Sequence, residues 1–209
     1  MSEPGLRERK KQETRQRITE AAIELFAERG FERVPVADIA VAADVSTATV
    51  FNYFPAKEDL IYDGMASFND TLLAAIRERP HGTSVVAAFR DYVLQPRGVL
   101  ADPGSPVLES LALVGRIVRD SPSLQARERL EADRAVEALR DLLADELGDR
   151  SLRPWAVASA LVGTTRGMAR EVQAAAAEGR ISARFTRQTL AAAGSAIDVV
   201  EAGLRAQDA

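Results

Sequence analysis

The sequence predicts an all-α protein of about nine helices, and three observations support this prediction. Apolar residues recur at the helical spacing i, i+3, i+4, i+7 in almost every long segment of the 209-residue chain. Proline and glycine residues mark the ends of these segments. No segment keeps the strict alternation of apolar and polar residues that is typical of a half-buried strand.

The first long helix is expected to end at Gly30. Ile18, Ala22 and Phe26 belong to its apolar face, because they follow one another at intervals of four residues. Gly30 suits the left-handed conformation that closes many helices, and Phe31 supplies the apolar contact that often accompanies it.

Two short segments follow, residues 36–43 and 47–54, joined by a turn at residues 44–46. Val45 would fill the turn, and Ser46 is a good N-cap for the second segment. Two short helices joined by a tight turn and packed on a preceding amphipathic helix are the arrangement of a helix-turn-helix.

The rest of the chain continues with longer helical segments. Pro55 breaks the second short segment, and the longest loop is expected between Pro96 and Pro106. The further expected helices span residues 56–79, 83–95, 107–120, 123–147, 152–178 and 185–206.

The composition excludes several classes of site. The chain has no cysteine, so it has no disulfide and no thiolate ligand or nucleophile. Its one histidine, His81, stands between a proline and a glycine in an expected polar loop, where we expect it to be exposed and without a functional role. We therefore predict no metal, no cofactor and no enzymatic activity. The alternative of an enzyme with an all-helical pocket lacks a nucleophile or an acid–base set.

No stretch of 18 apolar residues is present, and the first residues lack the apolar run of a secretory signal. We therefore expect a cytoplasmic protein that has no membrane partner.

The second short helix offers a face of short, uncharged side chains. Such groups can approach base edges and phosphates without a large desolvation cost. They are Thr47, Ala48, Thr49, Asn52 and Tyr53. Alternatively, a short polar helix face is simply solvated, so the flanking pattern has to decide between the two interpretations.

That flanking pattern resembles the TetR family of bacterial transcriptional regulators over about 45 residues. The matching residues are Arg17-Ile18, Ala21-Ala22, Leu25-Phe26-Ala27-Glu28-Arg29-Gly30-Phe31, Ile39-Ala40, Ala43, Val45-Ser46, Thr49, Tyr53-Phe54, Lys57-Glu58 and Leu60. The remaining residues match only as a plan of several helices that ends in two long apolar ones. Three positions depart from the pattern. Asp44 stands at a usual turn glycine, Phe51 at a common tyrosine, and Ala56 at a usual polar cap.

The resemblance implies a DNA-binding surface on the second short helix and at the start of the next. Thr47 and Ala48 would face bases, whereas phosphates would be contacted by Thr49, Asn52, Tyr53 and Lys57. Lys57 stands at a helix N-terminus, which also favours an anion. The full set of expected DNA-binding residues is Ser46, Thr47, Ala48, Thr49, Asn52, Tyr53 and Lys57. The first 17 residues carry six basic and three acidic residues. This arm would either follow the DNA backbone or a minor groove, or serve only as a solubilising tail.

The last two helices are expected to form a homodimer interface. The apolar residues of the last helix step by three and four, as in a helix–helix seam, and residues 155–168 are apolar nearly all round. The expected interface residues are Trp155, Leu161, Leu190, Ala193, Ile197, Val200 and Leu204. The alternative is that both helices pack only inside one protomer.

The resemblance also implies a pocket for a small effector among the middle helices. The expected lining is Met65, Phe68, Phe89, Tyr92, Leu111, Arg116 and Thr165. This chemistry suits a largely apolar ligand, and Arg116 would bind an anionic end of it unless it forms a structural ion pair with Glu109 or Asp120.

These expectations define two domains: residues 1–55, the arm and helix-turn-helix, and residues 56–209, the effector-binding and dimerisation domain. The predicted function is a ligand-responsive regulator, by default of the family a repressor, that binds a palindromic double-stranded operator as a homodimer. The alternative is a helical ligand carrier or sequestering protein without DNA binding.

Overall fold

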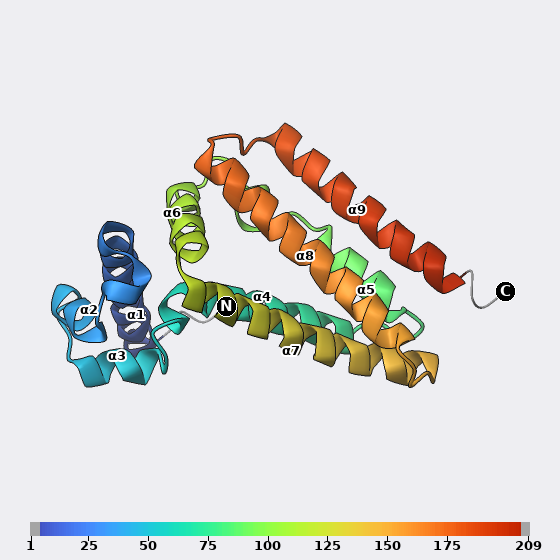
Figure 1. Ribbon diagram of the computed structural model, residues 1–209, viewed down its shortest axis with the longest axis horizontal. Coiled ribbons are helices and arrows are strands. Elements are labelled where there is room, and N and C mark those ends of the chain that lie inside the picture. The colour runs from blue at the N-terminus through green and yellow to red at the C-terminus, as the bar shows by residue number, and fades with distance from the viewer. Residues whose placement is uncertain (1–4, 206–209) are drawn as a thin grey trace. The chain divides into compact units, whose positions relative to one another are not determined.

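The computed structural model describes residues 5–205, and all their side chains except those of residues 63–67. Within this range the chain is helical throughout, with nine α-helices and two short 3₁₀ helices, η1 and η2 (Figure 1). The elements are α1 (Leu6–Arg29), η1 (Phe31–Arg33), α2 (Val36–Ala42), α3 (Thr47–Tyr53), α4 (Asp59–Arg77), α5 (Val85–Val93), η2 (Gly98–Leu100), α6 (Val107–Asp120), α7 (Pro122–Leu147), α8 (Arg153–Ala177) and α9 (Ala183–Arg205). The predicted all-α fold class with its N-terminal helix-turn-helix is confirmed.

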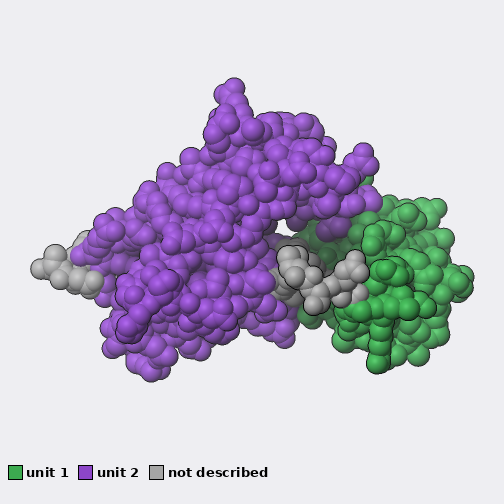
Figure 2. All heavy atoms as spheres, turned by 180° about the vertical axis from the view of Figure 1, so that it is seen from behind, with its two compact units in different colours: residues 1–65, 116–127 green, residues 66–115, 128–209 purple. Residues whose placement is uncertain are grey.

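Two compact units divide the chain (Figure 2). The first, which we call the head, comprises residues 1–65 and 116–127. The second, which we call the body, comprises residues 66–115 and 128–209. Helices α4, α6 and α7 each contribute residues to both units. The predicted division into a DNA-binding and an effector-binding domain at residue 55 concerns function and stays a prediction.

The head is built around buried aromatic rings. The rings of Phe26 in α1 and Phe31 in η1 lie 4.8 Å apart between centroids and are almost completely buried, as is Phe54 after α3. Gly30 separates α1 from η1 with a φ of 81°, and its N–H donates to the carbonyl of Phe26. The predicted helix end at Gly30 is therefore confirmed.

The turn between α2 and α3 requires a left-handed residue, and Asp44 supplies it with a φ of 51°. Aspartate tolerates this region better than most residues, which explains why the turn persists without the usual glycine. The N–H of Val45 then donates to the carbonyl of Ala40 at 3.0 Å and closes the turn.

Helix α4 begins at Asp59, three residues later than the sequence suggested. The backbone first makes a tight turn from Ala56, whose carbonyl accepts a bond from the N–H of Asp59. The Asp59 carboxylate reaches back and accepts a hydrogen bond from the N–H of Ala56 at 2.9 Å, as the acidic residue of a capping box does. Asp59 thus compensates for the missing polar cap at Ala56.

The body packs aliphatic side chains of α4, α5, α7, α8 and α9 around one core. Its fully buried members include Ile76, Phe89, Leu139, Leu161 and Ile197. Helices α8 and α9 pack against each other, as Figure 1 shows, and α5 packs on α9. No helix in the described part of the chain is both long and apolar enough to cross a bilayer.

Candidate DNA-binding site

Helix α3 is short and depends on its cap. The Ser46 hydroxyl accepts the N–H of Thr49 at 3.0 Å and lies 2.8 Å from the Thr49 hydroxyl. The N-cap predicted for Ser46 is therefore confirmed. The Ser46 and Thr49 hydroxyls, expected to contact DNA, are both engaged in the start of the helix.

One side of α3 anchors the helix and the other is open. Val50 is completely buried, whereas Thr47, Ala48, Phe51 and Asn52 are exposed. No lysine, arginine or histidine occurs between residues 36 and 53. The helix-turn-helix therefore presents an uncharged face that can approach the edges of base pairs at low desolvation cost.

Arg15 fixes the C-terminal end of α3. Its guanidinium donates to the carbonyl of Tyr53 at 3.3 Å and lies 4.5 Å from the centroid of the Phe54 ring. A cation at this end of a helix also complements the helix dipole. The sequence placed Arg15 among the charges of the basic arm and gave no signal for this long-range contact.

The basic arm is largely helical from Leu6 onward, as the first turns of α1. Its remaining cations are exposed along α1, which leaves them available to a polyanion. They are Arg7, Arg9, Lys10, Lys11 and Arg17.

Lys57 points into the head. Its ammonium donates to the carbonyl of Phe31 at 2.5 Å and lies 4.4 Å from the Phe31 ring centroid and 5.5 Å from that of Phe26. Desolvation by burial lowers its pKa below the ordinary lysine value, while Glu32 and Glu58 act in the opposite direction. The expectation that Lys57 faces a phosphate stays a prediction, and in this structure its ammonium is engaged with the Phe31 carbonyl.

The start of α7 is bonded to the rest of the head. The carboxylate of Glu32 accepts from the hydroxyl of Ser121 at 2.8 Å and from that of Ser123 at 2.6 Å. These serine hydrogen bonds hold the pKa of Glu32 below its usual value. Tyr62 donates its hydroxyl to the carbonyl of Leu124 at 2.7 Å.

A further link joins α7 to α4: Arg127 pairs with Asp59 at 3.3 Å. These bonds join residues about 60 to 90 positions apart, so no local pattern in the sequence could reveal them.

The body contains a small cavity of about 10 Å³. Its lining is mostly aliphatic and comprises Asn69, Leu72, Leu73, Ile76, Phe89, Ala135, Leu139, Val162 and Thr165. Of the predicted effector residues, Phe89 and Thr165 meet here. Asn69 is a polar lining residue that the sequence analysis missed.

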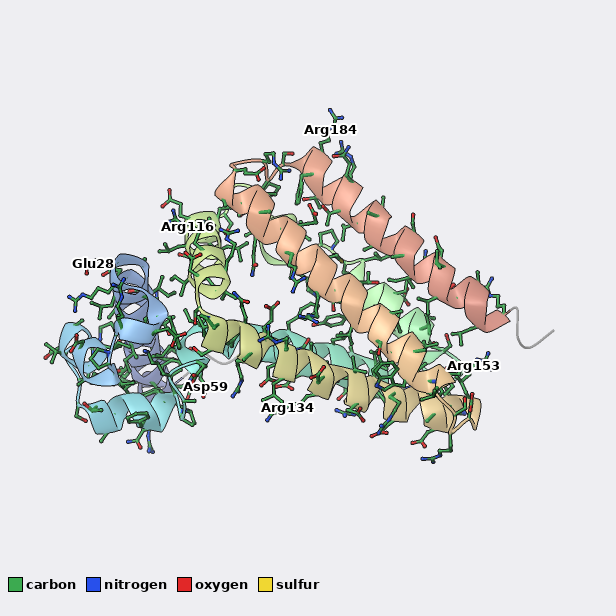
Figure 3. All side chains as sticks on the ribbon, viewed as in Figure 1. Glu28, Asp59, Arg116, Arg134, Arg153 and Arg184 are labelled. Atoms are coloured by element: carbon green, nitrogen blue, oxygen red, sulfur yellow. The ribbon has the colours of Figure 1, made fainter. Side chains whose placement is uncertain are left out.

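The other predicted effector residues lie elsewhere. Phe68 packs edge-on against Tyr92, with ring centroids 5.7 Å apart, and the hydroxyl of Tyr92 lies 2.6 Å from that of Thr71. Leu111 is half-buried on α6 and does not line the cavity. Arg116 is exposed on α6 (Figure 3) and does not line this cavity. The side chain of Met65 lies outside the described residues.

Most of the predicted dimer residues face the body's own core. Leu161 and Ile197 are buried there within one protomer, and Val200 and Leu204 pack against the same cluster. Ala193 is also buried on α9. Leu190 is half-buried. Leu161, Ala193 and Ile197 are therefore corrected, because a side chain buried inside its own protomer cannot contact a partner. The interface role of the other predicted residues stays a prediction. Trp155, in contrast, is 48% exposed on α8.

Comparison with known proteins agrees with this architecture. Residues 18–62 match the family model described as bacterial regulatory proteins, tetR family. The chain is 28% identical over 174 residues to the HTH-type transcriptional regulator TcmR of Streptomyces glaucescens, covering 80% of this chain and 76% of that protein. It is 57% identical over 47 residues to the HTH-type transcriptional regulator LuxR of Vibrio harveyi, covering 22% of this chain and 23% of that protein.

Solved structures share the fold. The structure of the transcriptional regulator FadR from Bacillus subtilis in complex with stearoyl-CoA aligns with a TM-score of 0.53 at 19% identity, covering 88% of this chain and 96% of that one.

The capped, uncharged recognition helix on a helix-turn-helix scaffold defines a DNA-binding transcriptional regulator. Residues 18–62 thus carry the DNA-binding domain of TetR-family regulators, and the similarity to TcmR extends along most of the chain.

Proposed function

We propose that this regulator is a ligand-responsive repressor that binds a palindromic operator as a homodimer and is released by a small, largely apolar effector. The observation that carries the proposal is the exposed face of α3, made of Thr47, Ala48, Phe51 and Asn52 and held in place by Ser46, Val50 and Arg15. A protein that occupies an operator overlapping a promoter blocks transcription.

Among the predicted DNA-binding residues, we assign base contacts to Thr47, Ala48 and Asn52, and a backbone contact to Tyr53. Electrophoretic mobility shift with the DNA upstream of the protein's own gene tests this assignment. Replacing Thr47 should alter base preference, whereas Tyr53→Phe should weaken binding to all sequences alike. The absence of any shift with wild-type protein at low salt would contradict DNA binding by α3.

The proposed dimer uses the outer face of α8 and α9. Trp155 is half-exposed, Val199 is 74% exposed, and Leu152, three residues before Trp155, is exposed as well. Small exposed residues continue this face along both helices and would allow close helix packing. They are Ala156, Ala160, Gly163 and Gly167 on α8, and Ala192, Ser195, Ala196 and Ala202 on α9. Two such faces can form a four-helix interface, with two recognition helices that read two half-sites one DNA turn apart.

Val199→Glu tests this interface. Burial of two unpaired carboxylates at a twofold contact costs several kcal/mol, so the variant should sediment as a monomer. Val107→Glu is the matched control, because Val107 is an exposed valine on α6. A wild-type protein that sediments as a monomer at micromolar concentration would contradict the dimer. An unaffected Val199→Glu dimer would place the interface elsewhere.

The effector site that we propose is an enlarged form of the body cavity. Seven of its nine lining residues are apolar, and Asn69 and Thr165 provide the polar groups. At about 10 Å³ the cavity holds about one water molecule, so an effector must displace its walls. The related fold of FadR accommodates stearoyl-CoA. Within α8 the Arg166 Nε is buried without a hydrogen-bond partner among the described residues, which favours Arg166 over Arg116 as a partner for an anionic end.

Displacement of the cavity wall would reach the head through α4. This helix supplies Leu72 and Ile76 to the cavity and Asp59 to the head. Suppose that an effector binds the state with α4 displaced about 100-fold more tightly than the state that binds DNA. It can then lower operator affinity by up to the same factor.

Calorimetry with stearoyl-CoA, with and without operator DNA, tests the coupling. If the effector weakens operator binding by a given factor, thermodynamic linkage requires that the operator weaken effector binding by the same factor. Equal affinities in both titrations would show that this ligand does not control DNA binding. The alternative, a ligand carrier without DNA binding, predicts ligand binding and no mobility shift.

A further inference from the structure

Phe51 differs from the other phenylalanine side chains of the head. Phe26, Phe31 and Phe54 are 1–4% exposed, whereas Phe51 is 47% exposed on α3. An exposed aromatic ring forgoes the free energy that its burial would provide. Its presence on the recognition helix therefore points to burial against the partner of that helix.

Phe51 shares one helix face with Thr47 and Ala48. Phe51 follows Thr47 by four residues and Ala48 by three, so its side chain neighbours both of theirs on the helix surface. All three are exposed and present carbon rather than charge. In the major groove the carbon surface that matches such a face is the C5-methyl group of thymine.

Asn52 adds one directional group to this surface. Its side chain is exposed beside Phe51. A carboxamide can donate to N7 and accept from the N6 amino group of adenine, which is the favoured pairing of asparagine with a base. Asn52 and Phe51 together therefore favour A·T base pairs.

The helix-turn-helix lacks the residue types that usually bind G·C pairs. Guanine is most often bound by arginine or lysine, and cytosine N4 donates to a carboxylate. Residues 36–53 contain no arginine or lysine, and α3 contains no acidic residue. Asp38 on α2 is paired with Arg29 at 3.1 Å.

We propose that each half-site of the operator has a core of consecutive A·T pairs, in which Phe51 and Ala48 contact thymine methyl groups and Asn52 binds adenine. Phe51 is then a specificity-determining residue. The proposal rests on DNA binding by α3, and it adds the base class that the helix selects.

The first experiment selects binding sequences from random duplex DNA with the full-length protein. Each half-site of the enriched sequences should contain at least two adjacent A·T pairs. Enrichment of half-sites with G·C cores would overturn the inference and leave DNA binding intact. No enrichment and no mobility shift would instead contradict the proposed function itself.

The second experiment removes single groups from the DNA. Deoxyuridine in place of thymidine keeps base pairing and removes only the methyl group, which should weaken binding about fourfold for each contacted methyl, the factor for burying one carbon. In Phe51→Ala the same replacement at the position that Phe51 contacts should have no effect. Deoxyuridine in the flanking DNA is the control. Equal sensitivity of wild type and Phe51→Ala at every half-site position would refute the Phe51 contact.

Asn52 is tested in the same way with 7-deazaadenine, which lacks N7. Wild-type affinity should fall about 5- to 100-fold for a bidentate contact at each half-site, and Asn52→Ala should not respond to the modified base. If Asn52→Ala keeps the full sensitivity, adenine is read by another residue. Circular dichroism of both variants checks that the helices are intact.

Discussion

The head and the body reach stability by different means. The head has a core with the rings of Phe26, Phe31 and Phe54, and specific polar contacts made by Arg15, Glu32, Lys57 and Asp59 surround it. The body is packed mainly by leucine, valine, isoleucine and alanine side chains. The head therefore depends on individual residues, whereas the body depends on an apolar pattern that many sequences satisfy.

This contrast explains why the sequence of the head matches a known family residue by residue, whereas the sequence of the body matches only in the order and length of its helices. Replacing one ring or one capping group in the head leaves a void or an unsatisfied polar atom. Aliphatic cores tolerate exchange when total volume is kept.

Phe26→Ala should destabilise the head strongly. The ring is buried and contacts both Phe31 and the Lys57 ammonium, so its loss leaves a cavity and removes a surface from a desolvated cation. We expect a loss of about 3–5 kcal/mol in the free energy of unfolding, measured by urea denaturation. Phe51→Ala is the control and should cost less than about 1 kcal/mol, as exposed positions usually do. Equal losses in both variants would contradict the burial that distinguishes these rings.

Leu139→Ala should destabilise the body by about 2–5 kcal/mol. Leu139 is buried and lines the cavity, so truncation enlarges the space that we assign to the effector. Isothermal titration with stearoyl-CoA should show tighter binding to this variant if the ligand enters there. Unchanged binding with reduced stability would place the effector site elsewhere.

Arg15→Met should weaken operator binding without changing its dependence on salt. The variant loses the bond to the Tyr53 carbonyl, and its stability should fall by about 1–2 kcal/mol. A residue that contacts phosphate instead contributes about one unit to the slope of log K against log salt. Arg7→Met, at an exposed cation of α1, is the matched comparison. A reduced slope in Arg15→Met would mean that Arg15 contacts DNA.

Glu32→Gln should remove a small part of the pH dependence of stability. The serine bonds lower the pKa of Glu32 in the folded state below the ordinary value of 4.5. Its contribution is therefore present above that value and is lost as pH falls through the lowered folded pKa. The side chain is exposed, so the effect should be modest. Urea denaturation at pH 6 and pH 3 should show a smaller difference for Glu32→Gln than for wild type.

The sequence was informative where structure is local. Gly30 and Ser46 set a helix end and a cap within three residues, and their predicted roles are confirmed. Asp44 holds the turn at a position where glycine is usual. The helix boundaries followed from apolar spacing for the same reason. The start of α4 was predicted three residues too early, because the group that compensates for the missing cap at Ala56 is Asp59, one turn further along.

Contacts between residues far apart in the sequence could not be predicted from local patterns. Ile197 follows a seam pattern that fits either a partner helix or the protomer's own core, and periodicity cannot choose between them. Lys57 was assigned to DNA because a lysine at a helix start suits an anion. Only the structure shows its ammonium on the Phe31 carbonyl. The bonds of Glu32 to α7 were not foreseen at all.

The uncharged face of α3 has a consequence for how the regulator finds its operator. Sliding and hopping along DNA depend on cations that attract the phosphates of any sequence. In the head these cations lie along α1, at Arg7, Lys10 and Arg17 among others, and none lies on the recognition helix. Search and selection thus rely on separate side chains. Substitutions at Thr47, Ala48 or Phe51 can therefore redirect the protein to new sites while its rate of scanning the chromosome stays the same.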